Sequence, residues 1–350
     1  MNTRPVAFIL ALLLSACTHM ASTEQASNGA TRVVMEEFMI PSGDPGIELY
    51  VRNKHAEGST KFPGNKIVLY VHGATYPSET AFDLQLNGMS WMDYIARHGY
   101  DVYLVDVRGY GRSTRPREMG EAADKNDPIV RTPVASKDVG AAVEFIRARR
   151  GADKINLLGW SWGTSIMGLY TTQNNDKVNK LVLYAPQWLR TTASLVSAGA
   201  KPGAYRTVTR DAARQRWLSG VAKDKQAELI PAGWYEAWAD ATFATDPQGG
   251  GKTLRAPNGV VVDGLDFWSS GKPLYDPGLI RVPTFLAHAE WDADLPSYML
   301  YAYFEKLVNV PYKRYVQIGE GTHTVIMEKN RLQLFQAVQQ FLDEDLKPAQ

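Results

Sequence analysis

The chain has 350 residues, of which 45% are hydrophobic and 21% are charged, a balance typical of a globular protein with a large core and unlike that of a disordered chain. Its 38 lysines and arginines and 37 aspartates and glutamates give a formal net charge of +1. This balance provides no long-range field that would favour nucleic acid or another polyanion as a partner.

The first sixteen residues have the features of a secretory signal peptide. Arg4 precedes an apolar run at residues 6–14, too short to span a bilayer, which needs about 20 apolar residues. The run leads into Leu14-Ser15-Ala16-Cys17, which resembles a bacterial lipobox, where cleavage precedes the cysteine and a diacylglycerol is attached to its thiol. We therefore expect residues 1–16 to be removed and Cys17 to carry a lipid.

Cys17 is the only cysteine of the chain, so no internal disulfide competes for its thiol. The alternative is a cleaved signal peptide with an incidental cysteine. The resemblance also implies that Thr18, rather than aspartate, at the second mature position directs the protein to the outer membrane of the cell envelope, facing the periplasm or the outside. Residues 17–30 are then a flexible tether.

From residue 31 onward, short apolar runs alternate with helical patterns, which indicates an α/β protein with a mostly parallel sheet covered by helices on both faces. A leading hairpin is expected at 32–38 and 46–51. Six further strands are expected at residues 66–71, 100–106, 154–158, 180–184, 282–288 and 313–318. Apolar residues at helical spacing ahead of Pro348 predict a closing helix over 325–346.

Between residues 187 and 281 the strand rhythm stops, which predicts an inserted helical cap that divides the core into 31–186 and 282–350. The cap contains five of the nine tryptophans. They are Trp188, Trp217, Trp234, Trp238 and Trp268. Because substrate pockets form beneath such caps, we expect some of these side chains to face a ligand.

The pentapeptide Gly-Trp-Ser-Trp-Gly at residues 159–163 follows a predicted strand and precedes a helix-compatible stretch at 164–171. On a sharp strand-to-helix turn the serine is strained, and the flanking glycines leave space where a side chain would collide with backbone. The helix N-terminus adds partial positive charge where an oxyanion would develop. This context indicates that Ser161 is a nucleophile.

The pentapeptide and its context resemble the α/β-hydrolase superfamily, over roughly residues 31–346. The segment Asp106-Val-Arg-Gly-Tyr-Gly-Arg-Ser113 is similar to the structural loop after that family's fourth strand. Residues 108–114 and the Ser-Trp-Gly sequence are similar to the proline iminopeptidase branch, which has His-Gly-Gly-Pro-Gly where this chain has His-Gly-Ala-Thr-Tyr at 72–76. The resemblance implies an α/β-hydrolase fold with an eight-stranded sheet.

In this family the acid and then the histidine follow the serine in the chain, which leaves His288 and His323 as candidate bases. His288 lies at the tip of a predicted strand, where we expect a structural role. His323 lies in a loop just after the last predicted strand, from which its imidazole can reach the serine. We therefore expect His323 to be the base.

Acidic residues at positions 290, 292 and 294 follow the predicted strand at 282–288. The family places its acid four residues before a proline that starts the next segment, which selects Asp292 ahead of Pro296. Asp294 and Glu290 remain alternatives. The acid's expected role is to hold the tautomer and orientation of the histidine.

An oxyanion hole needs two backbone N–H groups, and the resemblance implies those of Trp162 and Ala74. In the same loop as Ala74, His72 is expected to be structural.

Trp160 and Trp291 flank catalytic positions, so we expect them to line a substrate pocket of moderate size with apolar or aromatic walls.

A serine nucleophile indicates acyl transfer, so the sequence predicts a hydrolase of carboxylic esters of small to medium apolar or aromatic substrates. Two alternatives stay open: an amide or peptide hydrolase of the proline iminopeptidase kind, and a non-catalytic lipoprotein that binds a ligand. Because the sequence has no evident cluster of metal ligands and no glycine-rich phosphate loop, we expect no metal and no cofactor. The expected partners are a small ester and a membrane, but not nucleic acid.

Overall fold

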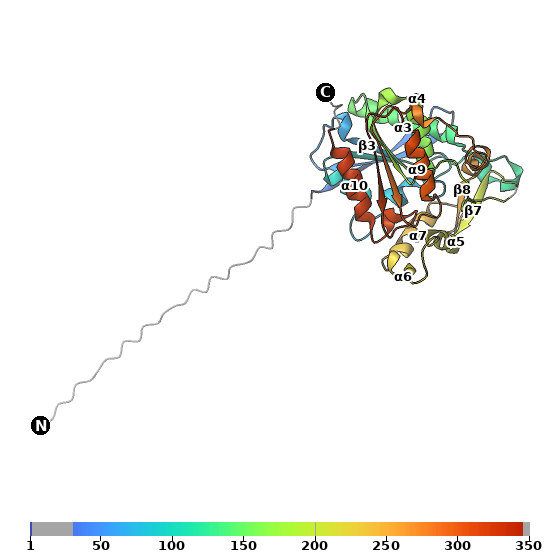
Figure 1. The fold of residues 1–350 in the computed structure, drawn as a ribbon. Coiled ribbons are helices and arrows are strands. Elements are labelled where there is room, and N and C mark those ends of the chain that lie inside the picture. Colours follow the sequence, from blue (N-terminus) through green and yellow to red (C-terminus); the bar gives the residue numbers. More distant parts are fainter. Residues whose placement is uncertain (2–30, 200, 346–350) are drawn as a thin grey trace. The chain divides into compact units, whose positions relative to one another are not determined.

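An eight-stranded sheet organises the chain from Thr31 onward (Figure 1). The computed structural model describes Met1 and residues 31–199 and 201–345. The strand order is β1-β2-β4-β3-β5-β6-β9-β10; β1 pairs antiparallel with β2 and β2 with β4, and the other neighbours are parallel. The strands are β1 (Val33–Pro41), β2 (Glu48–Ala56), β3 (Ile67–Val71), β4 (Asp101–Val105), β5 (Ile155–Trp160), β6 (Val178–Tyr184), β9 (Thr284–Ala289) and β10 (Lys313–Ile318).

The central strands are buried on both faces, which explains why their sequences are continuous apolar runs rather than alternating patterns. Every residue of β3, β4 and β5 is buried, whereas β1 at the sheet edge has several exposed positions. Each predicted strand of the sheet is present, with ends that differ by a few residues from the predicted ones. The predicted fold class is therefore confirmed.

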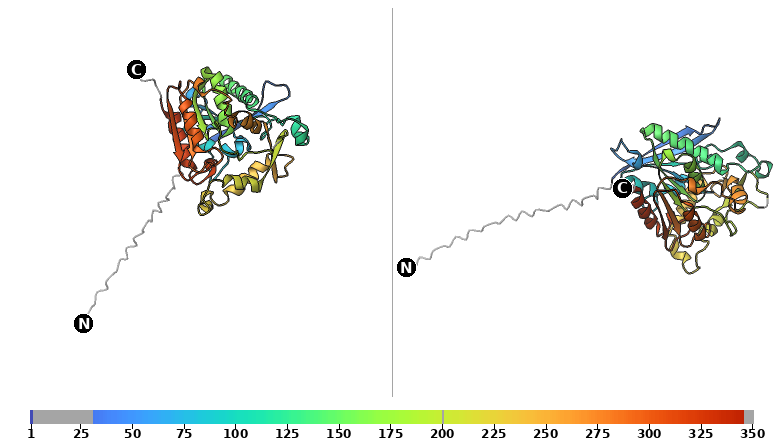
Figure 2. Two further views of the ribbon diagram at one scale, coloured as in Figure 1. Left: turned by 45° about the vertical axis from the view of Figure 1, so that its right-hand side comes forward. Right: turned by 45° about the horizontal axis from the view of Figure 1, so that its top comes forward.

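Helices cover both faces of the sheet (Figure 2). On one face α2 (Trp91–Arg97) packs against α10 (Arg331–Asp343), and on the other α3 (Thr132–Arg150) packs against α4 (Trp162–Gln173). Two shorter helices of the core are α1 (Ser78–Phe82) and α9 (Ser297–Lys306). The sheet is thus the middle layer of three.

The prediction of one closing helix over 325–346 is wrong. The chain first makes a 3₁₀ turn (Val325–Met327), and α10 follows only after a break. At the break, the buried carboxylate of Glu328 accepts a hydrogen bond from the Thr322 backbone N–H at 2.9 Å, a contact that draws the chain back toward the preceding loop. The Lys180 ammonium bonds carbonyls at the C-terminus of α10 at 2.8 and 2.9 Å, which favours the end of the helix there.

The segment predicted as a helical cap, residues 187–281, contains helices and in addition a two-stranded antiparallel sheet that was not predicted. The sequence Tyr-Arg-Thr-Val-Thr of β7 is rich in β-branched and aromatic residues, which favour a strand, but it lacks the continuous apolar run by which the equally short strands β3 and β4 are recognised. The elements of this segment, which we call the cap, are β7 (Tyr205–Thr209), α5 (Arg210–Trp217), α6 (Gln226–Leu229), α7 (Trp234–Ala244), β8 (Thr253–Pro257), α8 (Gly259–Asp263) and a π-helical turn (Gly264–Trp268).

Within the described ranges, no helix has both the length and the apolarity that crossing a membrane requires. The predicted signal peptide, the tether and Cys17 lie outside the described residues. Their prediction rests on the sequence alone.

A buried ion pair holds the loop after β4. The Arg108 guanidinium donates to the carboxylate of Asp138 on α3, with distances from 2.5 to 3.0 Å, and the Arg108 backbone N–H adds a bond of 3.0 Å. Arg108 also pairs with Asp44 at 2.7 Å, but the Asp44 side chain is 45% exposed whereas that of Asp138 is 0% exposed. These contacts agree with a structural role for the loop.

We expect Asp138→Ala to lower the free energy of unfolding by about 3 to 5 kcal/mol, because it leaves a buried arginine without its main partner. Asp44→Ala, which removes the exposed partner of the same arginine, should lower it by less than about 1 kcal/mol. Urea denaturation followed by circular dichroism measures both values. Equal losses in the two variants would contradict this assignment.

Candidate active site

Ser161 lies between β5 and α4 with backbone angles of φ 58° and ψ −121°, a region that costs a non-glycine residue about 1 to 3 kcal/mol. Its N–H donates to the Tyr184 carbonyl of β6 at 2.9 Å. Its carbonyl accepts from the N–H and the hydroxyl of Thr164, at 2.9 and 2.5 Å. The neighbouring strand and the first turn of the helix therefore hold the strained serine in place.

The two glycines of the pentapeptide allow close backbone contacts. A Cβ at Gly159 would lie 2.3 Å from the Gly163 carbonyl oxygen, and a Cβ at Gly163 would lie 2.6 Å from the Val71 carbonyl oxygen. No side chain fits at either position without moving the backbone. The interpretation of these glycines from the sequence is confirmed.

His323 and Asp292 are hydrogen-bonded partners. The Nδ1 of His323 lies 2.8 Å from the Asp292 Oδ2, and the Asp292 Oδ1 accepts from the Leu295 backbone N–H at 2.8 Å. The His323 carbonyl accepts from the Trp160 indole at 3.1 Å and from the Tyr184 hydroxyl at 2.6 Å. Both the ring and the backbone of His323 are therefore fixed, and its Nδ1 is the protonated nitrogen of the neutral ring.

The other candidate acids and the other candidate histidine are engaged elsewhere. Glu290 accepts from the Glu320 backbone N–H at 2.9 Å, and Asp294 pairs with Arg216. The Nε2 of His288 lies 2.7 Å from the Leu295 carbonyl oxygen, in the loop that carries Asp292. His288 thus supports this loop, in agreement with the structural role expected for it.

Burial and pairing act in opposite directions on the pKa values of this pair. Burial alone would raise the pKa of Asp292, but His323 and the Leu295 N–H outweigh it and hold that pKa below its ordinary value. Burial alone would lower the pKa of His323, yet the Asp292 carboxylate raises it above 6.5. The pair thus favours the protonated form of the imidazole.

Glu328 braces the loop that carries His323. Its carboxylate accepts from the Thr322 backbone N–H at 2.9 Å and from the Trp217 indole at 2.8 Å. Burial raises the pKa of Glu328 to about 7. This contact joins the histidine loop to the cap through a single carboxylate.

The loop after β3 is oriented through its carbonyl groups. The Nδ1 of buried His72 donates to the Gly73 carbonyl at 2.7 Å, and its Nε2 accepts from the Val107 N–H at 3.2 Å, so the ring is neutral and structural, as expected. Burial lowers the pKa of His72 to about 4. Because the N–H and C=O of a trans peptide point in opposite directions, fixing the Gly73 carbonyl also fixes the direction of the Ala74 N–H.

The next carbonyl of this loop, that of Ala74, accepts from the Tyr110 hydroxyl at 2.8 Å and from the Arg206 guanidinium of the cap at 2.6 Å. The loop passes close to the serine, since a Cβ at Gly73 would lie 3.4 Å from the Ser161 Oγ. On the other side, the N–H of Trp162, the first residue of α4, has no partner within the helix.

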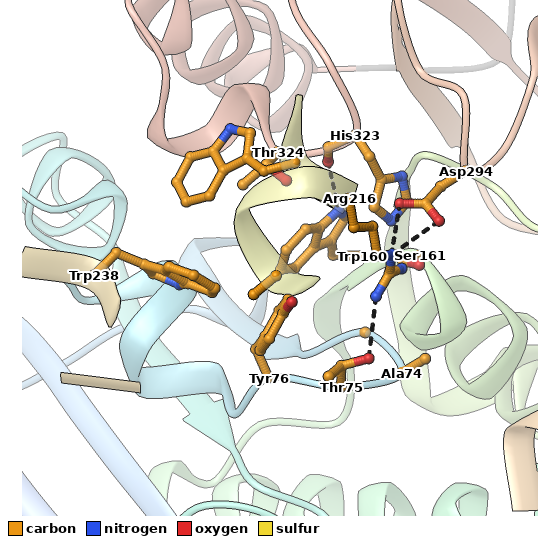
Figure 3. Close-up of a pocket in the computed structure, with 13 residues that line it drawn as sticks. Ala74, Thr75, Tyr76, Trp160, Ser161, Arg216, Trp238, Asp294, His323 and Thr324 are labelled. Atoms are coloured by element: carbon orange, nitrogen blue, oxygen red, sulfur yellow. Dashed lines mark hydrogen bonds and ion pairs between the residues drawn. The ribbon is translucent and has the colours of Figure 1, made fainter. Parts of the chain in front are cut away.

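Two cavities meet at Ser161. They share Ala74, Ser161, Arg216 and Asp294 as lining residues. The first, of about 20 Å³, contains His323 and several aromatic side chains (Figure 3). Its aromatic walls are Tyr76, Trp160, Trp217 and Trp238. The second, of about 330 Å³, has a mixed lining, in which apolar side chains lie beside polar ones that include Gln187, Arg190, Thr192, Ser194 and Ser197.

The expected aromatic pocket of moderate size is therefore not what these side chains form. Trp160 lines the first cavity, as expected, but this cavity has room for little more than one water molecule, which needs about 10 to 15 Å³. Trp291 lines neither cavity. Its backbone N–H donates to the Gly321 carbonyl at 2.8 Å, a contact that holds the backbone beside Asp292.

Of the five tryptophans in the cap, only Trp217 and Trp238 reach the cavity walls. Trp188 and Trp268 pack against each other with ring centroids 5.7 Å apart, and Trp234 lies under the Arg331 guanidinium at 4.5 Å. Trp188, Trp268 and Trp234 therefore contribute to packing, as most buried aromatic residues do.

A family model described as alpha/beta hydrolase fold matches residues 66–330. The chain belongs to this family. Human Lipase member N is 26% identical over 132 residues, which cover 37% of this chain but only 33% of the lipase. The chain thus spans about a third of the length of this relative.

Solved structures of hydrolases share the fold at low sequence identity. The 2-hydroxy-6-oxo-6-phenylhexa-2,4-dienoate hydrolase of Rhodococcus sp. strain RHA1 is 14% identical, with a TM-score of 0.56 over 89% of this chain and 99% of its own. A thermophilic esterase from Thermogutta terrifontis is 16% identical, with a TM-score of 0.54 over 88% of this chain and 98% of its own. Family membership supports hydrolase activity, and these structures show that the fold is shared.

Several residues at the site of this alpha/beta hydrolase escape sequence reasoning. Arg216 pairs with Asp294 through Nε at 3.0 Å to each carboxylate oxygen and donates to the Thr75 hydroxyl at 3.1 Å. Nothing in the sequence distinguishes Arg216 or Arg190 from the other arginines of the cap. In the part of the chain that the structure describes, no group of three or more histidine, cysteine, aspartate or glutamate side chains could hold a metal ion.

The hydrogen bond between His323 and Asp292 leads to a prediction about the pKa of His323. Asp292→Asn removes the charge that stabilises the imidazolium while burial remains, so the pKa of His323 should fall from above 6.5 to below it. Glu290→Gln, a neighbouring substitution that does not touch His323, should leave it in place. Nuclear magnetic resonance of the imidazole protons across a pH series measures the shift. An unchanged or raised value in Asp292→Asn would contradict the role of this contact.

Proposed function

We propose that this protein is a serine hydrolase of carboxylic esters that works through an acyl-enzyme, with Ser161 as nucleophile, His323 as base and Asp292 as the residue that orients the histidine. The observation that carries the proposal is that a strained serine and a histidine line one cavity, while the histidine's other nitrogen bonds a buried carboxylate. This arrangement provides the three roles that activate a serine.

The first half of the reaction forms the acyl-enzyme. The Nδ1–H of His323 donates to Asp292, which leaves Nε2 to accept the proton of the Ser161 hydroxyl as its oxygen attacks the ester carbonyl. The carbonyl oxygen becomes an oxyanion. Collapse of this intermediate breaks the bond to the leaving alcohol, whose oxygen takes the proton back from Nε2.

The second half releases the acid. Water donates its proton to Nε2 of His323 and its oxygen attacks the acyl carbonyl, and Ser161 then leaves with that proton. The raised pKa of His323 suits it to accept protons in both halves, because an imidazolium stabilised by Asp292 forms more readily. It also implies that kcat/KM falls on the acid side of a pKa above 6.5.

The backbone N–H groups of Trp162 and Ala74 are the proposed donors to the oxyanion. Trp162 begins α4, where the N–H is unpaired within the helix and the helix dipole favours negative charge. Ala74 belongs to the loop that passes the serine and is oriented by His72, Tyr110 and Arg206. Each such donor typically lowers the barrier by about 3 kcal/mol.

The sizes of the two cavities suggest which part of a substrate each one holds. The aromatic cavity of about 20 Å³ suits a small group, whereas the second cavity, of about 330 Å³, can take the larger part of the molecule. We infer an ester with one small side and one larger side.

We also propose, from the sequence alone, that Cys17 anchors the enzyme to a membrane of the cell envelope.

Release of p-nitrophenol from p-nitrophenyl acetate, butyrate and octanoate tests the ester reaction. We expect hydrolysis by the protein, and a loss of roughly 10⁵-fold or more in kcat for Ser161→Ala. Thr172→Ala, which removes a hydroxyl on the same helix that donates to the Leu169 carbonyl at 2.7 Å and lines neither cavity, should keep most of the activity. Equal rates for Ser161→Ala and the unaltered protein would refute the proposal, and cleavage of N-terminal proline amides but not of esters would favour a peptidase.

The anchor has a separate test. Cells that express the protein and grow with labelled palmitate should incorporate the label into it, and Cys17→Ser should abolish incorporation, because the hydroxyl cannot replace the thiol in lipid transfer. Unchanged labelling of Cys17→Ser would show that the lipid, if any, lies elsewhere.

A further inference from the structure

The larger cavity, of about 330 Å³ beside Ser161, has more positive than negative charge among its lining residues. Its ionisable lining residues are Arg190, Arg216 and Asp294. Asp294 is paired with Arg216, with both of its carboxylate oxygens 3.0 Å from Nε, and dashed lines join the two side chains in Figure 3. Arg190 is therefore the unbalanced charge of this cavity.

Arg190 is 9% exposed, and its guanidinium donates only to backbone carbonyls. Nη1 bonds the carbonyl of Ala193 at 2.9 Å, and Nη2 bonds that of Asp294 at 2.5 Å. None of the ion pairs within the described ranges includes Arg190. The carboxylates of Asp294 and Asp292 act on Arg190 only at longer range. A buried cation without a direct ion pair is unfavourable, and a guanidinium has more N–H donors than these two contacts use.

The neutral polar residues of the cavity also offer donors. The hydroxyl oxygens of Ser194 and Ser197 accept the N–H groups two residues further along the chain, at 3.2 and 3.4 Å, so their O–H groups remain available to donate. The amide oxygen of Gln187 accepts from Ser165 at 3.1 Å, which leaves its NH₂ group as the available end. A cluster of donors around an unbalanced cation is the chemistry that recognises an oxyanion.

Apolar side chains complete the wall between the serine and the arginine. They are Val196, Val260, Val261, Leu265 and Leu295. Such a wall suits a short aliphatic or aromatic spacer between the scissile ester and a charged end.

We propose that this cavity binds an anionic group, a carboxylate or a phosphate, and that the substrates of the enzyme are therefore acidic esters. The inference rests on the proposed ester hydrolysis for its position in the reaction, but the anion site itself does not depend on it. Arg190 contributes the unbalanced charge, Arg216 lies beside it, and Gln187 and the serine hydroxyls supply neutral hydrogen bonds.

Two pairs of esters that differ only in charge test the proposal with the full chain. On the acyl side, the mono-p-nitrophenyl ester of adipic acid is compared with p-nitrophenyl methyl adipate. On the alcohol side, 4-acetoxybenzoate is compared with its methyl ester. We expect kcat/KM to favour the acidic member of at least one pair, and the pair that responds shows which side of the ester occupies the cavity.

Arg190→Gln should reduce this preference by about 10- to 100-fold, the effect of losing a charge-assisted hydrogen bond. Arg190→Lys should retain part of it. Arg214→Gln is the matched control, because it removes the same charge from a cap side chain that is 52% exposed and lines neither cavity, and it should leave the preference unchanged. No preference in the unaltered protein, or an equal fall for both members of a pair in Arg190→Gln, would overturn the proposal.

Calorimetric titration of the Ser161→Ala protein separates this inference from the proposed function. Adipate and inorganic phosphate are the probes, and binding that weakens in the Ser161→Ala, Arg190→Gln double variant supports the anion site even if no ester is cleaved. The stronger probe distinguishes a carboxylate site from a phosphate site. Cleavage of neutral esters without any binding of either probe would leave the ester hydrolase in place and exclude the anion site.

Discussion

The strained backbone of Ser161 is the constraint on which the site depends. The first turn of α4 must pack so closely that Gly163 contacts the carbonyls of Val71 and His72, while Tyr184 of β6 holds the serine N–H. One set of close contacts therefore fixes the nucleophile, the start of α4 and the loop after β3 together. A larger residue at Gly159 or Gly163 would separate these three parts, so the glycines contribute to geometry rather than to chemistry.

Core and cap build the site jointly. Arg206 and Arg216 come from the cap, yet they donate to the Ala74 carbonyl and the Thr75 hydroxyl of the core loop, at 2.6 and 3.1 Å. The histidine loop is likewise joined to the cap through Glu328. Because these contacts hold both the loop that carries the proposed oxyanion donor and the loop that carries His323, the cap helps to position the reacting groups in addition to covering them.

The residues that the structure brings together at the site share a physical reason. Ser161 and Asp292 follow parallel strands, His323 follows the last one, and the carboxyl ends of parallel strands meet at one edge of a sheet. The same reasoning does not place Trp291 in a cavity, since a position next to Asp292 fixes the backbone but not the direction of the side chain. The short strand β7 was missed because its partly exposed residues lack the continuous apolar run that identifies β3 and β4, which have the same length.

The sequence by itself determined the succession of the main-sheet strands along the chain, the sharp turn at Ser161 and the residues placed at the strand ends, because these follow from local spacing of apolar residues, glycines and a histidine. Only the tertiary structure decided that the aromatic cavity is small, that Arg216 neutralises Asp294 and that Arg190 lies buried without a carboxylate partner in the described chain. Those features arise between segments that are far apart in the sequence, such as those of Arg190 and Asp294, and their packing, rather than any local pattern, sets the volume and charge of the site.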